Sequence, residues 1–162
     1  MVSLSSQSKK LGEKMSNMQS WKQNVGSIID YAERIFPEVE IVTRSLSGEI
    51  VKSNYGQVAK RAKKLGSALE SYGIKHGQNV GSLALNTYRN MEMYYGISGM
   101  GAVMHTINFR LHPEQVVYII NHAENRIIFL ETVFAPLLEA IQANCPTVEQ
   151  YVLLCSKEEM PE

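Results

Sequence analysis

Apolar positions change their spacing several times along this 162-residue chain, and each change predicts a different element. Between residues 21 and 36 they recur every three or four positions, which is typical of one face of a helix, and Pro37 ends that helix. Two short apolar stretches at 40–44 and 49–52 flank a Ser-Gly turn at 47–48. That arrangement indicates a β-hairpin.

A second amphipathic helix is expected over about 55–72. Ser53 or Asn54 can cap its first turn, because either side-chain oxygen can accept a hydrogen bond from a free backbone N–H, and Gly73 ends it. Its polar side carries a basic run, which we interpret as a solvated helix face and not as a phosphate site: Lys60, Arg61, Lys63 and Lys64.

The remainder alternates regularly between two kinds of pattern. Strands are expected at about 79–85, 102–107, 126–130 and 150–155, and helices at about 88–101, 113–124 and 134–143. Alternation with short connections predicts an α/β fold, a mostly parallel sheet with helices on both faces, preceded by the short hairpin. Residues 1–18 are expected to form a polar flexible leader, and residues 19–162 a single α/β domain.

Composition narrows the class of protein. Hydrophobic residues make up 44% of the chain, and 16 basic side chains balance 16 acidic ones, so neither nucleic acid nor an anionic membrane is an expected partner. No stretch reaches the roughly 20 apolar residues that span a bilayer, and no secretory signal is evident. Cys145 and Cys155 are too few for a disulfide framework. We therefore expect reduced thiols and a cytoplasmic protein.

The usual phosphate-binding loops of α/β proteins are missing. A P-loop requires a Gly-Lys pair, and the chain contains none; the Gly-x-Gly-x-x-Gly fingerprint between a strand and a helix is also absent. Gly96, Gly99 and Gly101 fall within or at the end of an expected helix, where close helix–sheet packing explains them better. A generic nucleotide-binding domain is disfavoured.

Catalytic and metal-binding patterns are absent as well. The four histidines show no metal-ligand spacing, and no Gly-x-Ser-x-Gly elbow occurs. His76 lies in an expected turn, His112 is placed to cap the helix that begins at Pro113, and His122 is placed near that helix's C-terminal end, where its dipole favours positive charge. We predict no catalytic, cofactor-binding or metal-ligating residue in this chain.

Two polar clusters follow expected strands and mark a candidate cleft edge. Ligands of open α/β sheets gather at the carboxyl ends of the strands. The alternatives remain open: Asn86 or Thr87 as a helix cap, His105 hydrogen-bonded in the core, and Arg110 paired with a surface carboxylate. The candidate residues are Asn86, Tyr88, Arg89, His105, Thr106, Asn108 and Arg110.

One long segment carries a family resemblance. Residues 83–108 read LALNTYRNMEMYYGISGMGAVMHTIN, and the likeness continues at RLHPEQ, YIINHA and PTVE and occurs earlier at YGQV and LGSAL. These stretches resemble the medium- and long-chain fatty-acyl-CoA ligases of the adenylate-forming superfamily, N-terminal portion only. The resemblance implies a partial N-terminal subdomain of an acyl-CoA synthetase. It also implies ATP, Mg²⁺ and CoA as cofactors of a full-length member, which joins a fatty acid to AMP and then to CoA.

The motifs that carry this chemistry in the family are absent here. They are the Thr-Ser-Gly-Thr-Thr-Gly-x-Pro-Lys-Gly loop, the Tyr-Gly-x-Thr-Glu motif, the hinge aspartate and the C-terminal lysine. We therefore expect the chain alone to be inactive, with fatty acid and CoA as partners only in a full-length context. The alternative is a non-enzymatic interaction module that pairs as a homodimer or with an intact ligase.

Two local departures from the family pattern affect the cleft edge. Phe109 stands where members usually have proline, which is expected to free that loop, and Glu131 stands where an aspartate is common. If the rest of a ligase is not present, an exposed sheet edge or an uncovered apolar face is also expected.

Overall fold

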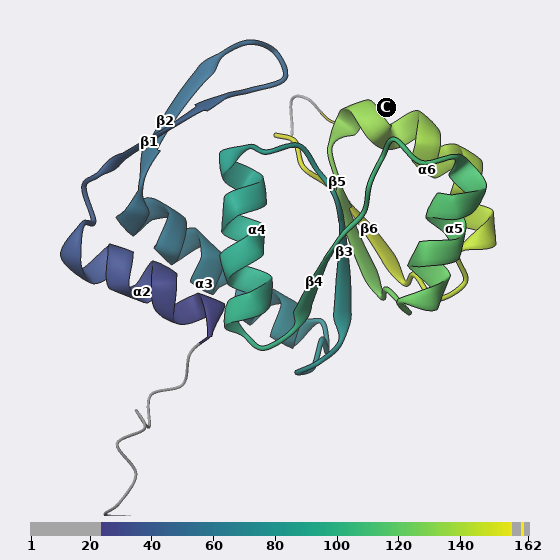
Figure 1. Cartoon of the computed structure of the whole chain (residues 1–162), viewed down its shortest axis with the longest axis horizontal. Coiled ribbons are helices and arrows are strands. Elements are labelled where there is room, and N and C mark those ends of the chain that lie inside the picture. Colours follow the sequence, from purple (N-terminus) through teal and green to yellow (C-terminus); the bar gives the residue numbers. More distant parts are fainter. Residues whose placement is uncertain (1–23, 157–159, 161–162) are drawn as a thin grey trace, which may run out of the picture.

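The computed structural model describes residues 24–156 and residue 160 (Figure 1). The predicted leader at 1–18 and the predicted helix start at Trp21 lie outside these residues. In chain order the elements are α2 (Val25–Ile35), β1 (Glu40–Arg44), β2 (Ile50–Asn54), α3 (Tyr55–Ser71), β3 (Asn79–Leu83), α4 (Tyr88–Gly99), β4 (Val103–Thr106), α5 (Pro113–His122), β5 (Ile127–Leu130), the 3₁₀ turn η1 (Thr132–Phe134), α6 (Ala135–Ile141), the 3₁₀ turn η2 (Gln142–Asn144) and β6 (Gln150–Leu153).

The predicted hairpin is confirmed, and it forms a small sheet of its own. β1 and β2 pair antiparallel, with Glu40 opposite Asn54. Gly48 in the turn has φ +89°, a left-handed conformation that glycine adopts without strain. Asn54, one of the two predicted caps, begins α3 by accepting a hydrogen bond from the Gln57 backbone N–H at 2.8 Å.

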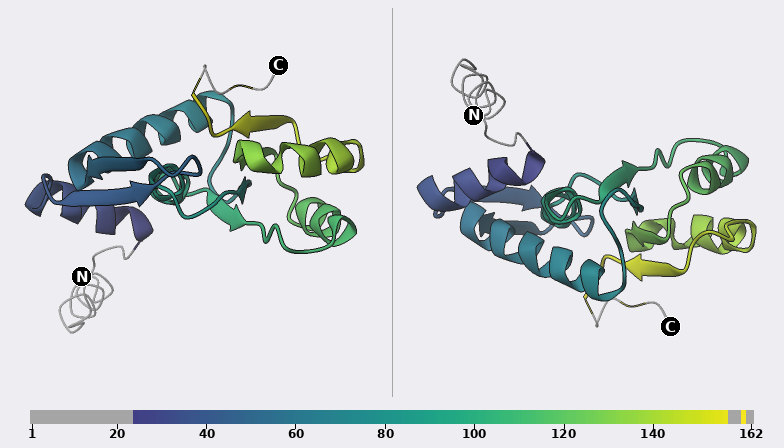
Figure 2. Two further views of the ribbon diagram at one scale, coloured as in Figure 1. Left: turned by 90° about the horizontal axis from the view of Figure 1, so that it is seen from above. Right: turned by 90° about the horizontal axis from the view of Figure 1, so that it is seen from below.

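The main sheet has four parallel strands in the order β4-β3-β5-β6. Every residue of β5 is buried, as expected for a central strand covered on both faces. The sheet lies between α3 and α4 on one face and α5 and α6 on the other (Figures 1 and 2). This arrangement confirms the predicted α/β class with helices on both faces.

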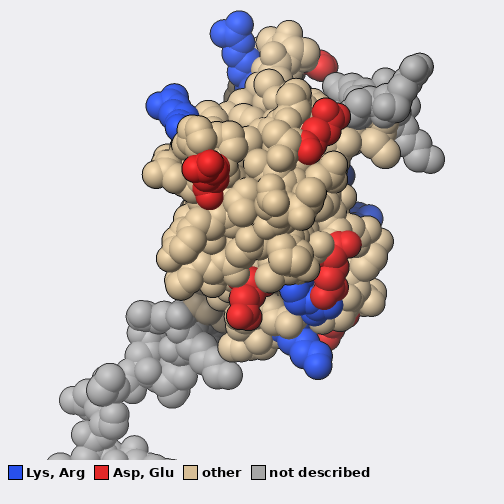
Figure 3. Space-filling view, turned by 90° about the vertical axis from the view of Figure 1, so that its right-hand side faces the viewer, with Lys and Arg blue, Asp and Glu red and all other residues tan. Residues whose placement is uncertain are grey.

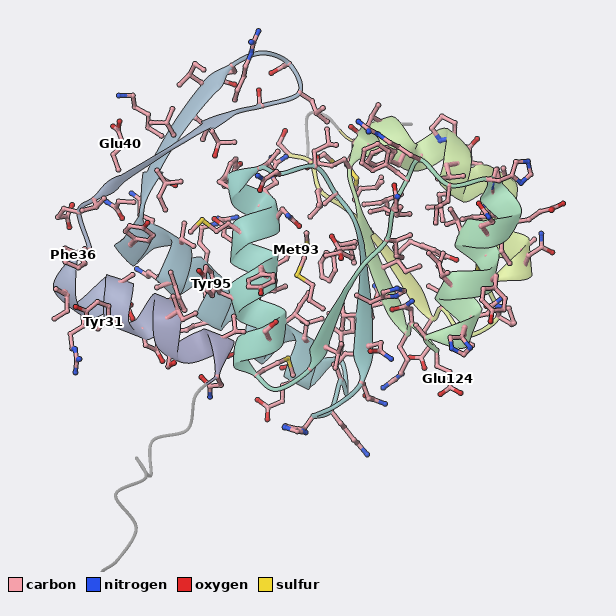
Figure 4. The ribbon with its side chains drawn as sticks, in the orientation of Figure 1. Tyr31, Phe36, Glu40, Met93, Tyr95 and Glu124 are labelled. Carbon is pink, nitrogen blue, oxygen red and sulfur yellow. The ribbon has the colours of Figure 1, made fainter. Side chains whose placement is uncertain are left out.

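Alternate residues of β5 divide between the two cores. Ile127 and Phe129 pack with Met93 and Ile97 of α4, whereas Ile128 and Leu130 pack with the helices of the other face. Because side chains alternate along a strand, β5 stabilises both layers at once. Met93, labelled in Figure 4, reaches from α4 toward the sheet.

Gly96, Gly99 and Gly101 permit close packing, but the sheet, which was the predicted packing partner, is wrong. A Cβ on Gly96 would lie 2.7 Å from the Ala62 carbonyl oxygen of α3, so Gly96 lets two helices approach each other. Gly99 lies beside Gly26 of α2. Gly101, with φ +89°, follows α4 and lies against the His76 ring. The contacts are therefore made with helices and a turn and not with the sheet.

The basic run on α3 is exposed, yet two of its members bridge helices. Lys63 Nζ lies 3.1 Å from Asp30 Oδ1 and also contacts Glu33, both on α2. Arg61 Nε lies 2.7 Å from Glu92 Oε1 on α4. The run is thus more than a solvated face, because it ties α3 to both neighbouring helices.

The charged side chains of the described residues do not form a patch of one sign on the face shown in Figure 3. On the face shown in Figure 3, acidic and basic side chains are scattered among other residues. Within residues 24–156, no helix combines the length and the apolar character needed to cross a bilayer.

Candidate functional site

The carboxyl ends of β3, β5 and β6 meet at one edge of the sheet, where α4 begins (Figure 1). Thr87 and Arg89 come from the connection after β3 and the first turn of α4, Glu131 directly follows β5, and Leu154 follows β6. This convergence is expected for parallel strands, and it is the position where open α/β sheets bind ligands.

A set of hydrogen bonds joins these three strand ends. Thr87 Oγ1 donates to Glu131 Oε1 at 3.3 Å, and Arg89 Nη1 donates to the Leu154 carbonyl oxygen at 2.8 Å. The Glu131 backbone N–H donates to the Leu83 carbonyl oxygen at 3.1 Å. Glu131 is only 3% exposed, so the hydrogen bond from Thr87 offsets part of the cost of burying its carboxylate. We call Thr87, Arg89, Glu131 and Leu154 the sheet-end network.

The hairpin covers this network from above. Ser45 and Ser47, at the hairpin turn, join the network residues in lining a cavity of about 70 Å³. Asn86 and Tyr88 line a separate cavity of about 360 Å³ between β1 and the start of α4. The hairpin therefore closes the edge of the sheet at which the first candidate cluster lies.

Neither predicted cap provides a side-chain hydrogen bond to α4. Thr87 is the N-cap residue, but its hydroxyl donates to Glu131 and not to the helix. Asn86 is exposed. The alternative that a side chain of Asn86 or Thr87 caps α4 is therefore wrong, because the Thr87 hydroxyl instead joins the ends of β3 and β5.

The second candidate cluster, at the end of β4 and in the loop after it, does not join the sheet-end network. The half-buried His105 lies with Nδ1 2.8 Å from Nδ2 of the fully buried Asn125, which is the core hydrogen bond considered as its alternative. Thr106 and Asn108 are exposed, and Asn108 Oδ1 accepts from the Arg110 backbone N–H at 3.0 Å. These residues line none of the cavities that Arg89 lines. A binding role for all seven candidates remains a prediction.

Phe109 does not free the loop, contrary to expectation. Its ring stacks on Phe134 with centroids 4.8 Å apart, and the Arg110 guanidinium lies 5.8 Å above it. An aromatic ring supplies contact area that replaces the rigidity of proline. Among the described residues, no carboxylate lies within ion-pair distance of Arg110, so the predicted surface pairing is wrong.

The remaining histidines have structural positions. His112 is the N-cap residue of α5, and its backbone N–H donates to Gln115 Oε1 at 3.2 Å. His122 ends α5 and stacks on Tyr118 with ring centroids 5.5 Å apart. His76 lies in the turn before β3. These placements agree with the sequence interpretation.

Neither cysteine forms a disulfide. Both are free thiols, Cys145 buried and Cys155 half-buried. Burial raises the pKa of the Cys145 thiol, and burial together with the neighbouring Cys145 raises the pKa of Tyr151 to about 12. Both groups therefore stay protonated near neutral pH, which is unfavourable for a nucleophile.

Glu92 is a buried carboxylate that the sequence interpretation missed. It lies on α4 and is 6% exposed. Burial raises its pKa, while the hydrogen bond from Arg61 offsets part of that effect. The available signal was its spacing, since Glu92 lies four residues from Gly96 on the helix face that packs against α3.

Replacing Glu92 with glutamine should alter how stability depends on pH. Because the folded-state pKa is raised, the folded protein binds the proton more tightly than the unfolded chain, and this stabilises it at low pH. The contribution is lost as pH rises above about 4.3 through the folded pKa. The stability difference, wild type minus Glu92→Gln, should therefore fall as pH rises above about 4.3 in urea unfolding. A difference that stays constant or rises would contradict this account.

Comparisons with known proteins agree with the geometry. A family model described as AMP-binding enzyme matches residues 31–162. A 3-methylmercaptopropionyl-CoA ligase from Ruegeria pomeroyi is 44% identical over 135 residues, covering 83% of this chain and 25% of that ligase. A long-chain-fatty-acid–CoA ligase from Thermus thermophilus is 36% identical over 150 residues, covering 90% of this chain and 28% of that ligase. The crystal structure of an anthranilate CoA ligase with anthranoyl-AMP has a TM-score of 0.74 at 26% identity, covering 82% of this chain and 25% of that one.

The chain therefore belongs to the AMP-binding enzyme family, and the relatives described above are CoA ligases. The resemblance noted in the sequence is confirmed, with the N-terminal portion of such a ligase as the corresponding part. The chain spans only about a quarter of the length of the curated relatives described above.

The family implies ATP, Mg²⁺ and CoA for a full-length enzyme. Mg²⁺ prefers several oxygen ligands at octahedral geometry. No group of three or more His, Cys, Asp or Glu side chains within the described residues could hold a metal ion. The carboxylate of Glu131 accepts from Thr87, and that of Glu92 accepts from Arg61.

Proposed function

We propose that this chain is the N-terminal structural part of an acyl-CoA ligase and that its sheet-end network forms one wall of the ligase's cleft. The observation that supports this proposal is the pair of hydrogen bonds from Thr87 to Glu131 and from Arg89 to the Leu154 carbonyl. They fix three strand ends at the edge where α/β sheets bind ligands. The wall orients its neighbours and excludes water, and it performs no proton transfer or nucleophilic attack.

The ligase reaction itself would be carried out by a longer protein of which this chain is a part. CoA ligases of this family activate a carboxylic acid with ATP and then transfer the acyl group to CoA, with a fatty acid as the substrate class that the sequence resemblance implies. Transfer of the adenylyl group to the carboxylate, with pyrophosphate as the leaving group, depends on cations and backbone donors placed around the phosphates. The motifs that supply them in the family have no counterpart in this sequence. We infer that the chain alone is inactive.

Inactivity is tested by ATP–pyrophosphate exchange. The purified 162-residue chain should give no exchange above the blank with medium- or long-chain fatty acids and Mg²⁺, because it lacks the phosphate-binding loop. The long-chain-fatty-acid–CoA ligase from Thermus thermophilus serves as the positive control. Exchange that depends on fatty acid and persists after repeated purification would overturn the inference.

An interaction module is the second candidate, favoured by the apolar surface of α2 and the hairpin. Ile28 is 59% exposed and Val42 57%, and Tyr31 and Phe36 meet edge-to-face at the outer end of α2 (Figure 4). Exposed apolar clusters of this kind are typical of contact surfaces. Pairing with a second copy or an intact ligase would give a concentration-dependent mass in light scattering. A strict monomer that retains no ligase in a pull-down would exclude this function. A cytoplasmic location stays a prediction.

A further inference from the structure

The hairpin has a free edge along β1. Among the described strands β1 pairs with β2 alone, so its other side is the edge of a two-stranded sheet. The Ser45 backbone N–H donates to the Glu49 carbonyl oxygen at 2.8 Å, and hydrogen-bonded pairs alternate along an antiparallel ladder. Every second residue of β1 therefore bonds to β2, and the backbone N–H groups of Val42 and Arg44 point away from it. They are free to bond to another strand.

A groove of about 360 Å³ runs along this edge, between β1 and the start of α4. Ile41, Val42 and Thr43 all line it, although the side chains of successive strand residues point to opposite faces. Successive residues share one groove where that groove follows the edge of the strand, at which the outward N–H and carbonyl groups lie. No residue of β2 lines it. We call it the β1–α4 groove.

The opposite wall of this groove is uncharged and rich in groups that form hydrogen bonds. Burial, together with the neighbouring Tyr55 and Tyr94, raises the pKa of Tyr95, so this phenol stays neutral. None of the described residues that line the groove is acidic or basic, and a charged side chain placed there would lose water without gaining a partner. The wall consists of Asn86, Thr87, Tyr88, Asn90, Met91, Tyr94 and Tyr95.

A single extended polypeptide strand matches both walls. Its backbone would bond to the outward groups of β1, as in the addition of a strand to an exposed sheet edge, and every second side chain would face α4. A second copy of the chain fits less well, because α4 stands beside the β1 edge in each copy. Two such edges could meet only if the two α4 helices occupied the same space.

The amount of polypeptide outside this chain points to the source of the strand. The chain spans about a quarter of the length of its ligase relatives, so most of a full-length ligase lies outside it. A two-stranded hairpin is marginally stable by itself, and a third strand strengthens it. Val42 and Ile50, more than half exposed, show that the hairpin is little covered in the isolated chain.

We propose that the β1–α4 groove binds an extended, uncharged strand from the remaining part of the ligase, which extends the hairpin to three strands at the β1 edge. This inference rests on the function proposed above and adds to it the place where the rest of the ligase attaches. The strand bonds to the backbone of β1 through one edge, and its inward side chains lie among the tyrosines and asparagines of α4.

Amide hydrogen exchange tests the added strand directly. The isolated 162-residue chain is compared with a chimera that carries its residues 24–156 in place of the matching part of the Ruegeria pomeroyi 3-methylmercaptopropionyl-CoA ligase. The Val42 and Arg44 N–H groups should exchange at least about tenfold more slowly in the chimera, because the added strand accepts hydrogen bonds from them. The Ile50 and Lys52 N–H groups, which point outward from β2, should exchange equally fast in both proteins.

Two proline variants of the chimera separate strand addition from general burial. Val42→Pro removes one outward N–H of β1 and keeps the bonds to β2, so exchange at Arg44 should become about three- to tenfold faster. Lys52→Pro is the matched control, since Lys52 lies opposite Val42 and its N–H is on the other edge of the hairpin. It should leave Arg44 unchanged. Circular dichroism checks that both variants fold.

The outcomes distinguish this inference from the proposed function. A chimera that forms its thioester while Val42 and Arg44 exchange as fast as in the isolated chain would overturn the inference and leave the proposed function standing. Equal slowing at both edges of the hairpin, or equal effects of the two proline variants, would overturn it as well. Slowing in the isolated chain that grows with protein concentration would overturn it by assigning the edge to a second copy. A chimera that does not fold would contradict both.

Discussion

Ile128→Ala should lower the free energy of unfolding by about 2–5 kcal/mol. Ile128 is fully buried in β5, between β3 and β6. It lies directly beside Gly81, where an added Cβ would come within 2.9 Å of Ile128 Cγ1. Because Gly81 has no side chain to fill the vacated space, truncation leaves a cavity in the core formed with α5 and α6.

The matched control uses the same substitution on an exposed strand. Ile50 in β2 is 55% exposed, so Ile50→Ala should change the free energy of unfolding by no more than about 1 kcal/mol. Urea unfolding followed by circular dichroism gives both values. Similar losses for the two variants would show that β5 is not the centre of the folded core.

Gly96→Ala should destabilise the protein by about 1–3 kcal/mol, although alanine is the better helix former by about 1 kcal/mol. The new Cβ would lie 2.7 Å from the Ala62 carbonyl oxygen and 3.2 Å from a Leu65 methyl carbon. A backbone carbonyl cannot rotate away as a side chain can, so α3 and α4 must separate. Thermal and urea unfolding should both show the loss.

Gly99→Ala is the control on the same helix. Gly99 is exposed, and the nearest heavy atom outside its own helix to an added Cβ is the Gly26 Cα at 3.9 Å, an ordinary contact. The substitution should be neutral or stabilising by up to about 1 kcal/mol. If Gly96→Ala were as well tolerated as Gly99→Ala, the close α3–α4 contact would be wrong.

Much of this fold was predictable because its signals are local. The apolar run at 126–130 predicted a strand, and the Ser-Gly pair at 47–48 predicted a hairpin turn. Asn54 and Gly73 marked the two ends of α3 through their capping chemistry. Each of these depends on neighbours within a few positions.

What the sequence did not predict depends on tertiary contacts. The spacing of Gly96 indicated close approach but not that α3 would be the partner. His105 lies near the end of β4 and Arg89 lies after β3, yet His105 bonds to Asn125, while Arg89 bonds to the end of β6. The sequence placed Glu92 on a helix but did not indicate that Arg61 of α3 would bond to it. These pairings join residues 20 to 65 positions apart, which periodicity does not encode.

The central claim is that this chain serves as the N-terminal scaffold of a CoA ligase. The most direct measurement replaces the matching segment of the Ruegeria pomeroyi 3-methylmercaptopropionyl-CoA ligase, 44% identical over 135 residues, with the corresponding residues of this chain. The account predicts a folded chimera that forms its CoA thioester within about tenfold of the parent rate, a loss of no more than about 1.4 kcal/mol in transition-state stabilisation. A chimera that folds with the parent's thermal stability but forms no thioester would contradict it.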